Sequence, residues 1–337
     1  MRKRKDFVMI CFSPRRCLVL LTAALCLTGC RFSAQPEAVP EALYTEAVEL
    51  EWIDIEDEAV ALAASPAVQP AGRQVSAPGT AAKTCDTAII DYSNRNDGYI
   101  MVRYTSATDQ RLKVLLNGPG GTTYNYNLTA QEWTAFPLSD GNGEYTVSLY
   151  INAYGTKYAS VLAASFTASL TDEFGPFLYP NQYVDYASAP NTVAKAAELV
   201  GSLDEPLEKV AAIYDYVVET LTYDTQKAAA VQSGYLPVLD TVLSEKKGIC
   251  FDYSALMAGM LRSQGIPCKL VVGYAGDTYH AWINVWSEED GWIDAVIYFD
   301  GKTWQRMDPT FASSSNRSSS IMDYIGNGTN YTEKYLY

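Results

Sequence analysis

The sequence predicts an α+β protein in which a β-sandwich precedes a second domain of helices and antiparallel strands. Between Cys85 and Leu170, apolar and polar residues alternate with a period of two, which is typical of half-buried strands. The later part of the chain changes to the period of amphipathic helices, and strand-like runs follow at 269–274, 280–286 and 303–308. The chain has 337 residues, which is enough for two domains.

The alternating segment contains about seven short runs separated by turns rich in Gly, Asn and Asp. These turns lie at 94–98, 117–121 and 140–143. Short strands at this spacing predict an immunoglobulin-like β-sandwich over residues 85–170. The segment has no histidine, and its one cysteine lies at its boundary. We therefore expect a spacer or binding module there.

Charge and composition exclude several classes of function. The formal net charge is −14, with 25 Lys and Arg against 39 Asp and Glu. Nucleic acid is therefore not an expected partner, because a phosphate backbone needs a basic face. The chain has one histidine, His280, which argues against multi-histidine metal sites, and we expect no metal or other cofactor. The seven cysteines do not form a disulfide framework, although a bridge between Cys85 and Cys268 is conceivable outside the cytoplasm.

The first thirty residues have the features of a secretory signal. Basic residues precede an apolar run from Cys17 to Leu27, which is short for a membrane span. The run ends in Leu27-Thr28-Gly29-Cys30, which resembles the lipobox of bacterial lipoproteins. We therefore expect lipid attachment at Cys30 and an extracytoplasmic protein anchored to the bacterial cell membrane. A plain signal peptide or an uncleaved N-terminal anchor is the alternative.

Residues 31–84 predict a flexible acidic tether. They are rich in Ala, Pro and Glu, include nine acidic residues between Glu37 and Glu58, and show no strand-like alternation. A coil of this length spans about 40 Å root-mean-square, enough to hold a domain away from a membrane surface. A short helix between Glu41 and Leu62 is the alternative interpretation.

The second domain, expected over residues 171–337, begins with an aromatic connector and then becomes helical. Asn191 is the expected N-cap of a first helix, Pro206 is expected to open a second, and a short third helix is expected at 238–245. The C-terminal part is expected to fold back through a short strand near 331–337.

Three residue types that can form a catalytic triad follow in order. Cys250 precedes an apolar helical repeat that stops at Gly265, so it stands at a helix N-terminus, where unpaired N–H groups favour thiolate over thiol. His280 opens a strand-like run that shares one face with Trp282, and Asp308 ends another run. An imidazole can take the thiol proton while a carboxylate holds the ring in the correct tautomer. Spacing alone does not establish contact among the three.

The same segments resemble the bacterial transglutaminase-like domain of the papain-like thiol superfamily, over about residues 190–315. The matching stretches are KGICFDYSALMAGMLRSQGIPCKLVVGY from Lys247, HAWINVW from His280 and WQRMDPTF from Trp304. The resemblance implies a helix bearing Cys250 packed against an antiparallel sheet bearing His280 and Asp308. It also implies that a backbone N–H near the cysteine stabilises an oxyanion.

The interval between His280 and Asp308 is longer than is usual in that family. Residues 292–301 look like an inserted hairpin turn, and their presence leaves Asp294 as a rival third member. Asp308 is preferred because it ends a strand-like run, precedes Pro309 and matches the D-P-T motif.

The resemblance allows two functions. The first is an extracytoplasmic thiol enzyme that acts on amide bonds of a protein or peptide, cell-wall peptides included, through a thioester. Water as the acceptor makes it a peptidase or amidase, which we slightly prefer, whereas an amine makes it a transglutaminase. The second is a non-catalytic lipoprotein that uses the same fold for binding or scaffolding at the cell envelope.

Overall fold

The computed structural model describes residues 72–288, 291–293, 297–299, 304–306 and 331–337. The predicted signal sequence, the lipid site at Cys30 and most of the tether lie outside these residues, as do Asp294 and Asp308. The described residues all belong to one compact unit of the chain. Within them, no helix is long and apolar enough to cross a membrane.

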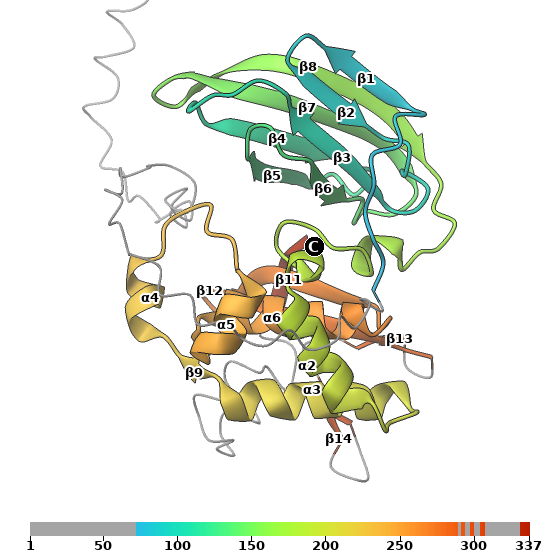
Figure 1. Ribbon diagram of the computed structural model, residues 1–337, viewed down its shortest axis with the longest axis vertical. Helices are drawn as coiled ribbons and strands as arrows, with labels where there is room; N and C mark the ends of the chain where they lie inside the picture. Colours follow the sequence, from blue (N-terminus) through green and yellow to red (C-terminus); the bar gives the residue numbers. More distant parts are fainter. Residues whose placement is uncertain (1–71, 289–290, 294–296, 300–303, 307–330) are drawn as a thin grey trace, which may run out of the picture. The chain divides into compact units, whose positions relative to one another are not determined.

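The first part of the described chain forms two antiparallel sheets of four strands each (Figure 1). One sheet has the order β1-β2-β3-β6 and the other has the order β5-β4-β7-β8. The strands are β1 (Ala82–Cys85), β2 (Ala88–Asp91), β3 (Tyr99–Tyr104), β4 (Leu112–Asn117), β5 (Thr123–Leu128), β6 (Thr134–Pro137), β7 (Gly143–Tyr154) and β8 (Lys157–Ala168). The first strand begins three residues before the predicted boundary at Cys85, because residues of the expected tether pair with β2.

Alternation along these strands produces the core of the two sheets. In β4, Leu112, Val114 and Leu116 are buried, whereas the residues between them are half-buried. Tyr124 and Tyr126 of β5 alternate in the same way and join the same hydrophobic cluster. The period-two pattern is therefore confirmed as strands, with side chains of one parity directed into the core.

An aromatic connector leads from β8 to the helical part of the chain. It contains the short 3₁₀ turns η2 (Gly175–Phe177) and η3 (Tyr186–Ser188). The hydroxyl of Tyr186 lies against the carbonyl oxygens of Leu178 at 2.8 Å and Arg73 at 3.0 Å. Arg73 also forms an ion pair with Asp172, so the segment before β1 is tied to the connector.

The helices that follow the connector include one that is central and buried. They are α2 (Pro190–Val200), α3 (Pro206–Thr220), α4 (Thr225–Ala230), α5 (Leu239–Glu245) and α6 (Cys250–Ser263). In α6 every residue from Asp252 to Ser263 is buried, and α2, α3 and α5 pack against it. Most of these residues are apolar, as expected for a helix in this central position. Asp252 and Arg262 are its buried charged residues.

The predicted N-cap at Asn191 is wrong. The first helix begins at Pro190, and its flanking residue Ala189 offers no side-chain cap. The carboxylate of Asp240 instead accepts the backbone N–H groups of Asn191 at 3.1 Å and Thr192 at 2.8 Å. Because this acceptor lies 48 residues along the chain from Thr192, local sequence could not reveal it.

A third antiparallel sheet of four strands lies beside α6 and has the order β13-β12-β11-β16. Its strands are β11 (Cys268–Ala275), β12 (Thr278–Ser287), β13 (Gly291–Ile293) and β16 (Tyr331–Leu336). Two further pairs are β9 (Thr222–Tyr223) with β10 (Lys247–Gly248), and β14 (Ile297–Phe299) with β15 (Trp304–Arg306). The strand at β16 confirms the expectation for the C-terminal segment.

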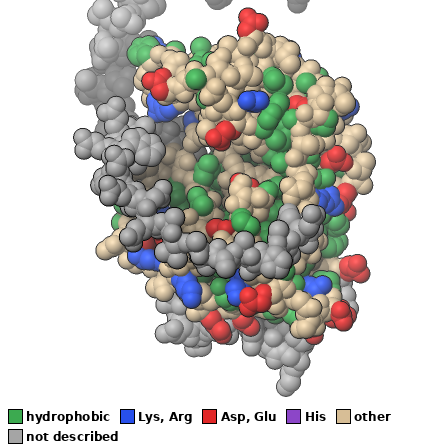
Figure 2. Space-filling model, viewed as in Figure 1, with side chains coloured by type: hydrophobic (Ala, Val, Ile, Leu, Met, Phe, Trp, Pro, Cys, Tyr) green, Lys and Arg blue, Asp and Glu red, His purple; other side chains and the backbone are tan. Residues whose placement is uncertain are grey.

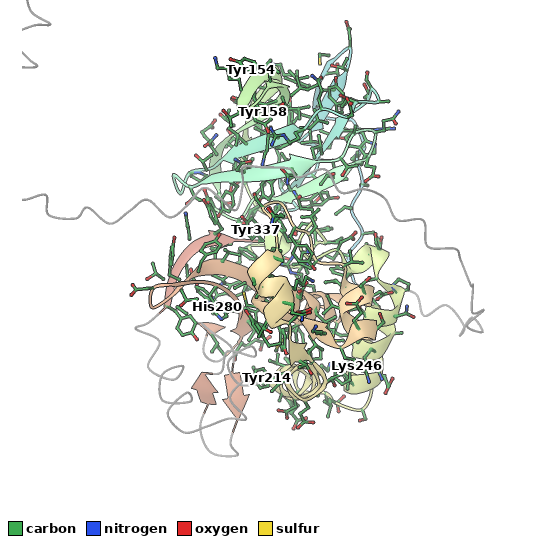
Figure 3. All side chains as sticks on the ribbon, turned by 90° about the vertical axis from the view of Figure 1, so that its left-hand side faces the viewer. Tyr154, Tyr158, Tyr214, Lys246, His280 and Tyr337 are labelled. Atoms are coloured by element: carbon green, nitrogen blue, oxygen red, sulfur yellow. The ribbon has the colours of Figure 1, made fainter. Side chains whose placement is uncertain are left out.

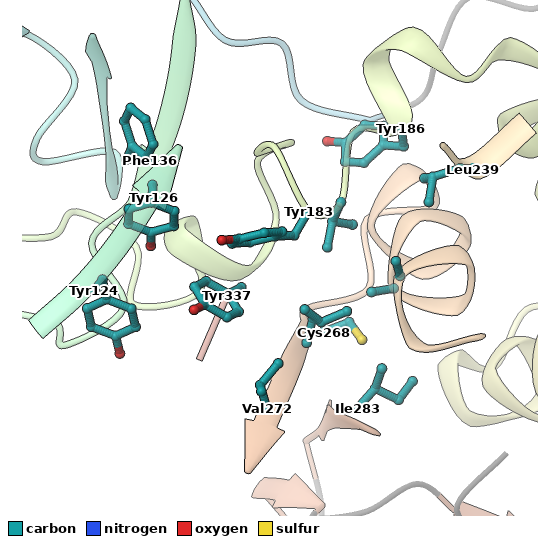
Figure 4. Close-up of a cluster of buried hydrophobic side chains, with 14 of the residues drawn as sticks. Tyr124, Tyr126, Phe136, Tyr183, Tyr186, Leu239, Cys268, Val272, Ile283 and Tyr337 are labelled. Carbon is teal, nitrogen blue, oxygen red and sulfur yellow. The ribbon is translucent and has the colours of Figure 1, made fainter. Parts of the chain in front are cut away.

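Aromatic rings connect strand β5 to the later elements (Figure 4). The ring of Tyr183 in the connector lies 4.5 Å from that of Tyr337 and 5.8 Å from that of Tyr126 in β5. Tyr183 also lies 5.4 Å from Phe251, the second residue of α6. One continuous hydrophobic cluster therefore includes residues of β5, the connector and α6.

Candidate active site

Cys250 is the first residue of α6, as the sequence predicts. The preceding residue, Ile249, is extended (φ −96°, ψ 176°), and the helix begins directly after it. Cys250 carries a free thiol and is half-buried, whereas the helix beyond Phe251 is buried. The thiol therefore stands at the positive end of a helix and at the point where that helix approaches the surface.

His280 is the third residue of β12 rather than its first. It pairs with Gly273 of β11, and the residue is 5% exposed. Figure 3 shows its position. The imidazole lies 6.3 Å from the indole of Trp282, with the two ring planes inclined by 25°. A Cβ at Gly273 would lie 2.8 Å from the Trp282 ring and 2.0 Å from the carbonyl oxygen of Thr332, so only glycine fits opposite His280.

The two faces of β12 have different surroundings. Ala281, Ile283 and Val285 belong to the main core together with the residues of α6. Trp282, on the face of His280, forms a separate small cluster with Val271. The predicted alternation is therefore confirmed. Because α6 packs on both β11 and β12, the structure brings together the helix of Cys250 and the strand of His280.

The remaining sequence-predicted residues have different outcomes. Asp308 and its rival Asp294 lie outside the described residues, so the third member stays a prediction. Cys85 and Cys268 are both free, so the conceivable bridge between them is absent. Cys268 is buried on β11, and burial raises the pKa of its thiol to about 12, which is unsuited to nucleophilic chemistry at neutral pH.

A polar network that the sequence analysis missed surrounds the first turn of α6. Asp252 is fully buried, and its Oδ2 accepts the backbone N–H of Ile249 at 2.8 Å. The ammonium of Lys227 in α4 lies 2.8 Å from the same oxygen, and the hydroxyl of Tyr235 donates to Oδ1. The available signal was an acidic residue at the third helical position, which is half of a capping box.

Gly248 makes this network possible. A Cβ at this position would lie 2.5 Å from the Cβ of Asp252 and 3.0 Å from its Oδ2. A side chain there would therefore displace the carboxylate from the N–H of Ile249. The G-x-C-x-D spacing has a physical basis, since the glycine leaves the room that the aspartate needs.

The described residues contain no group of three or more His, Cys, Asp or Glu side chains suited to hold a metal ion. Acidic and basic side chains are interspersed over the face shown in Figure 2. The chemistry that the described part of the site can supply is therefore that of a thiol, an imidazole and backbone N–H groups at a helix start.

Comparison with known proteins points to the same segment. Residues 193–309 match a family model described as the transglutaminase-like superfamily. This range includes Cys250, His280, Asp294 and Asp308.

Three curated relatives match between 29% and 56% of the chain. The uncharacterized protein YebA of Bacillus subtilis is 28% identical over 117 residues, covering 29% of this chain and 16% of that protein. A protein-glutamine gamma-glutamyltransferase of Pseudomonas aeruginosa is 30% identical over 119 residues, covering 31% of this chain and 17% of that protein. The chain thus matches less than a fifth of the length of these two relatives. The uncharacterized protein ML0607 of Mycobacterium leprae is 28% identical over 212 residues, covering 56% of this chain and 72% of that protein.

Two solved structures are similar at low sequence identity. A candidate cysteine protease from Cytophaga hutchinsonii is 15% identical, with a TM-score of 0.36 and coverage of 71% of this chain and 76% of that one. A transglutaminase of red sea bream is 14% identical, with a TM-score of 0.30 and coverage of 69% of this chain and 54% of that one.

Proposed function

We propose that the transglutaminase-like domain matched at residues 193–309 is a thiol enzyme acting on amide bonds, with Cys250 as nucleophile and His280 as general base. The observation that carries this proposal is a free, half-buried thiol at the start of a buried helix, which packs on the strand bearing the chain's only histidine. Asp308 is the proposed third member, which would hold the imidazole in its reactive tautomer.

The proposed reaction has two steps. His280 removes the Cys250 thiol proton, and the thiolate attacks the amide carbonyl carbon to give a tetrahedral oxyanion, stabilised by backbone N–H groups at the α6 start. The C–N bond breaks as the imidazolium returns its proton to the leaving amine or ammonia, which leaves a thioester. Water or a second amine then attacks the thioester and restores the thiol. We propose water as the principal acceptor.

Labelling of individual thiols tests the proposed nucleophile without knowledge of the substrate. Iodoacetamide at neutral pH, followed by mass spectrometry of the peptides, should label Cys250 faster than exposed Cys85, while buried Cys268 stays unmodified. The His280→Ala variant should remove this advantage. Labelling of Cys250 no faster than Cys85 would favour a binding or scaffolding role for the same fold.

The acceptor is tested separately. A peptide carrying a glutamine carboxamide is incubated with the protein in the presence and absence of a primary amine, and Cys250→Ala is the control. Loss of ammonia without incorporation of the amine is expected for a hydrolase. Incorporation of the amine as the main product would contradict that choice and assign acyl transfer.

We also propose that residues 82–168 form an immunoglobulin-like sandwich. The supporting observations are two sheets, one containing β2-β3-β6 and one ordered β5-β4-β7-β8, and the position of Tyr145 near the start of β7. The hydroxyl of Tyr145 lies 2.8 Å from the carbonyl oxygen of Gly141 and 3.1 Å from that of Leu138. A tyrosine that bonds back to the preceding corner in this way is a hallmark of such sandwiches.

The cellular location is proposed from the sequence. We propose a lipid at Cys30 that anchors the chain to the outer face of the bacterial cell membrane, with protein or peptide substrates of the cell envelope. Cys30→Ala should move the protein from the membrane fraction to the medium or block its processing. Unchanged membrane association with an intact N-terminus would indicate an uncleaved anchor.

A further inference from the structure

We propose that Asp252, together with Lys227, is a positioning pair that orients Cys250 and sets the charge beside its thiol. The inference rests on the proposed function, because it concerns the same nucleophile. Neither residue is a member of the proposed Cys-His-Asp triad, and neither is proposed to react with the substrate.

The burial of Asp252 is the first step of the inference. A carboxylate with no exposed surface is costly unless charge and hydrogen bonds compensate it. Asp252 has both kinds of partner, since Lys227 lies at 2.8 Å and the N–H of Ile249 also lies at 2.8 Å. The Lys227 ammonium is additionally 2.6 Å from the hydroxyl of Tyr235, which itself donates to Asp252. The burial and this hydrogen bond raise the pKa of Tyr235, so it remains a donor.

The second step is the direct link from this pair to the nucleophile. The N–H that Asp252 accepts belongs to Ile249, the residue immediately before Cys250. This bond holds Ile249 extended and fixes where the first helical turn starts. The direction of the Cys250 side chain therefore depends on the position of the Asp252 carboxylate.

The third step concerns α4, which supplies Lys227. None of the residues of α4 (Thr225–Ala230) is buried, so apolar packing contributes little to its position. Polar contacts hold it instead. Asp224 accepts the N–H groups of Gln226 at 3.1 Å and Lys227 at 2.9 Å, and the Asp224 N–H donates to the carbonyl oxygen of Gly248 at 2.8 Å. These contacts hold α4 where the Lys227 ammonium reaches Asp252 at the start of α6.

The electrostatic consequence can be measured. Asp252 is a negative charge two residues from the thiol, and Lys227 neutralises it. Neighbouring elements carry further charged groups. Asp224 and Lys247 pair at 3.1 Å, and Glu245 ends α5, which packs against α6. The imidazole of His280 lies on β12, which also packs against α6. Titratable tyrosines near α6 include Tyr253 of α6 itself, Tyr214 and Tyr216 of α3, Tyr274 of β11 and Tyr279 of β12. Removing one member of the buried pair leaves the other charge uncompensated near Cys250.

The test measures the pH at which iodoacetamide labelling of Cys250 in the full chain reaches half its maximal rate. Asp252→Asn keeps an acceptor for the Ile249 N–H but leaves the Lys227 cation, so the midpoint should fall. Lys227→Met leaves the Asp252 anion, so the midpoint should rise. Each shift should be about half a pH unit or more, which is roughly a threefold change in labelling rate below the midpoint.

Matched controls separate this effect from general destabilisation. Asp240→Asn removes a carboxylate that accepts two N–H groups of α2, and Lys195→Met breaks an exposed pair with Glu198. Neither control should move the midpoint. Tyr235→Phe keeps both charges of the buried pair and should raise the midpoint by less than Lys227→Met.

Shifts of the labelling midpoint in opposite directions for Asp252→Asn and Lys227→Met support the inference. A purely structural role for the two residues would not move the midpoint in opposite directions. Unchanged midpoints, or shifts in one direction for both variants, overturn it. If Asp252→Asn does not fold, Lys227→Met and Tyr235→Phe decide, and unchanged midpoints in both overturn it. The outcome is independent of the proposed reaction, since wild-type Cys250 that labels no faster than Cys85 would refute the enzyme while leaving these shifts measurable.

Discussion

Replacing Arg262 with methionine is expected to destabilise the protein by about 3 kcal/mol. The guanidinium is 1% exposed and donates to the carbonyl oxygen of Cys268 at 2.7 and 2.9 Å and to that of Tyr179 at 3.1 Å. It also donates to the carbonyl oxygen of Tyr337. One side chain thus joins the start of β11, the aromatic connector and the end of the chain that follows β16. Burial lowers the pKa of the guanidinium to about 10, so it stays charged at neutral pH.

The size of this loss in stability depends on which carbonyl oxygens are left without a hydrogen-bond donor in Arg262→Met. The carbonyl of Tyr337 keeps the N–H of Leu270 at 2.9 Å. The carbonyl of Cys268, which is buried, and that of Tyr179, which is partly buried, lose the guanidinium. A buried carbonyl left without a donor costs roughly 1–3 kcal/mol, and a partly buried one costs less because water reaches it. Removal of a buried charge offsets part of this loss. The net change of about 3 kcal/mol is near the middle of the resulting range.

Urea unfolding of the full chain measures this loss. Arg111→Met is the matched control, because Arg111 is exposed and donates to the carbonyl of Gly155 at 2.7 Å. Its free energy of unfolding should change by no more than about 0.5 kcal/mol. Arg262→Lys should be no more stable than Arg262→Met, since an ammonium keeps the desolvation cost without the planar fork that reaches several acceptors. A loss below about 1 kcal/mol for Arg262→Met, or a lysine variant as stable as wild type, would refute the reasoning.

Three further predictions follow from the same structure. Tyr145→Phe should lower the free energy of unfolding by about 1 kcal/mol in urea, because it removes the hydroxyl that bonds to the corner before β7; Tyr150→Phe, on a half-buried side chain of β7, should change it by less than half that amount. Burial raises the pKa of Tyr186 from 10.0 to about 12, so its contribution to stability is fully present below pH 10 and is lost between pH 10 and 12, which unfolding at a series of alkaline pH values measures. Asp308→Asn should reduce turnover of an amide substrate by orders of magnitude with the fold intact, whereas Asp294→Asn should have a mild effect; a larger loss for Asp294→Asn would reverse the assignment.

Periodicity predicted the elements that bury a regular face. The period of two in β4 and β5 placed alternate side chains in one core, and the apolar repeat after Cys250 gave a helix buried on all sides. The cap of α2 could not be predicted, because Asp240 replaces the expected Asn191 from a different helix. The start of α6 at Cys250 was visible in the local sequence, whereas the start of α2 depends on a carboxylate that folding brings from another helix.

In the candidate site, too, local features were predicted and partners distant in the sequence were not. The sequence predicted the places of Cys250 at a helix start and of His280 on a strand face shared with Trp282. It did not predict the partners of Asp252, since Lys227 and Tyr235 lie in a segment with no regular apolar pattern, 25 and 17 residues before it. The fold alone brings Lys227 of α4 and Tyr235 of the following loop into contact with Asp252.

The residues that carry the family resemblance can be separated by what the fold requires of them. Gly248 and Gly273 are needed because a Cβ at either position meets other atoms at 2.5 Å or less, and Arg262 is needed because it satisfies buried carbonyls. A protein that used this fold only for binding would need these three residues as much as an enzyme would. Cys250 is different, because it is half-buried at a helix end, where serine or alanine would fit the same backbone. A free thiol at that position is therefore the part of the motif that packing does not explain, and its reactivity distinguishes the enzyme from the scaffold.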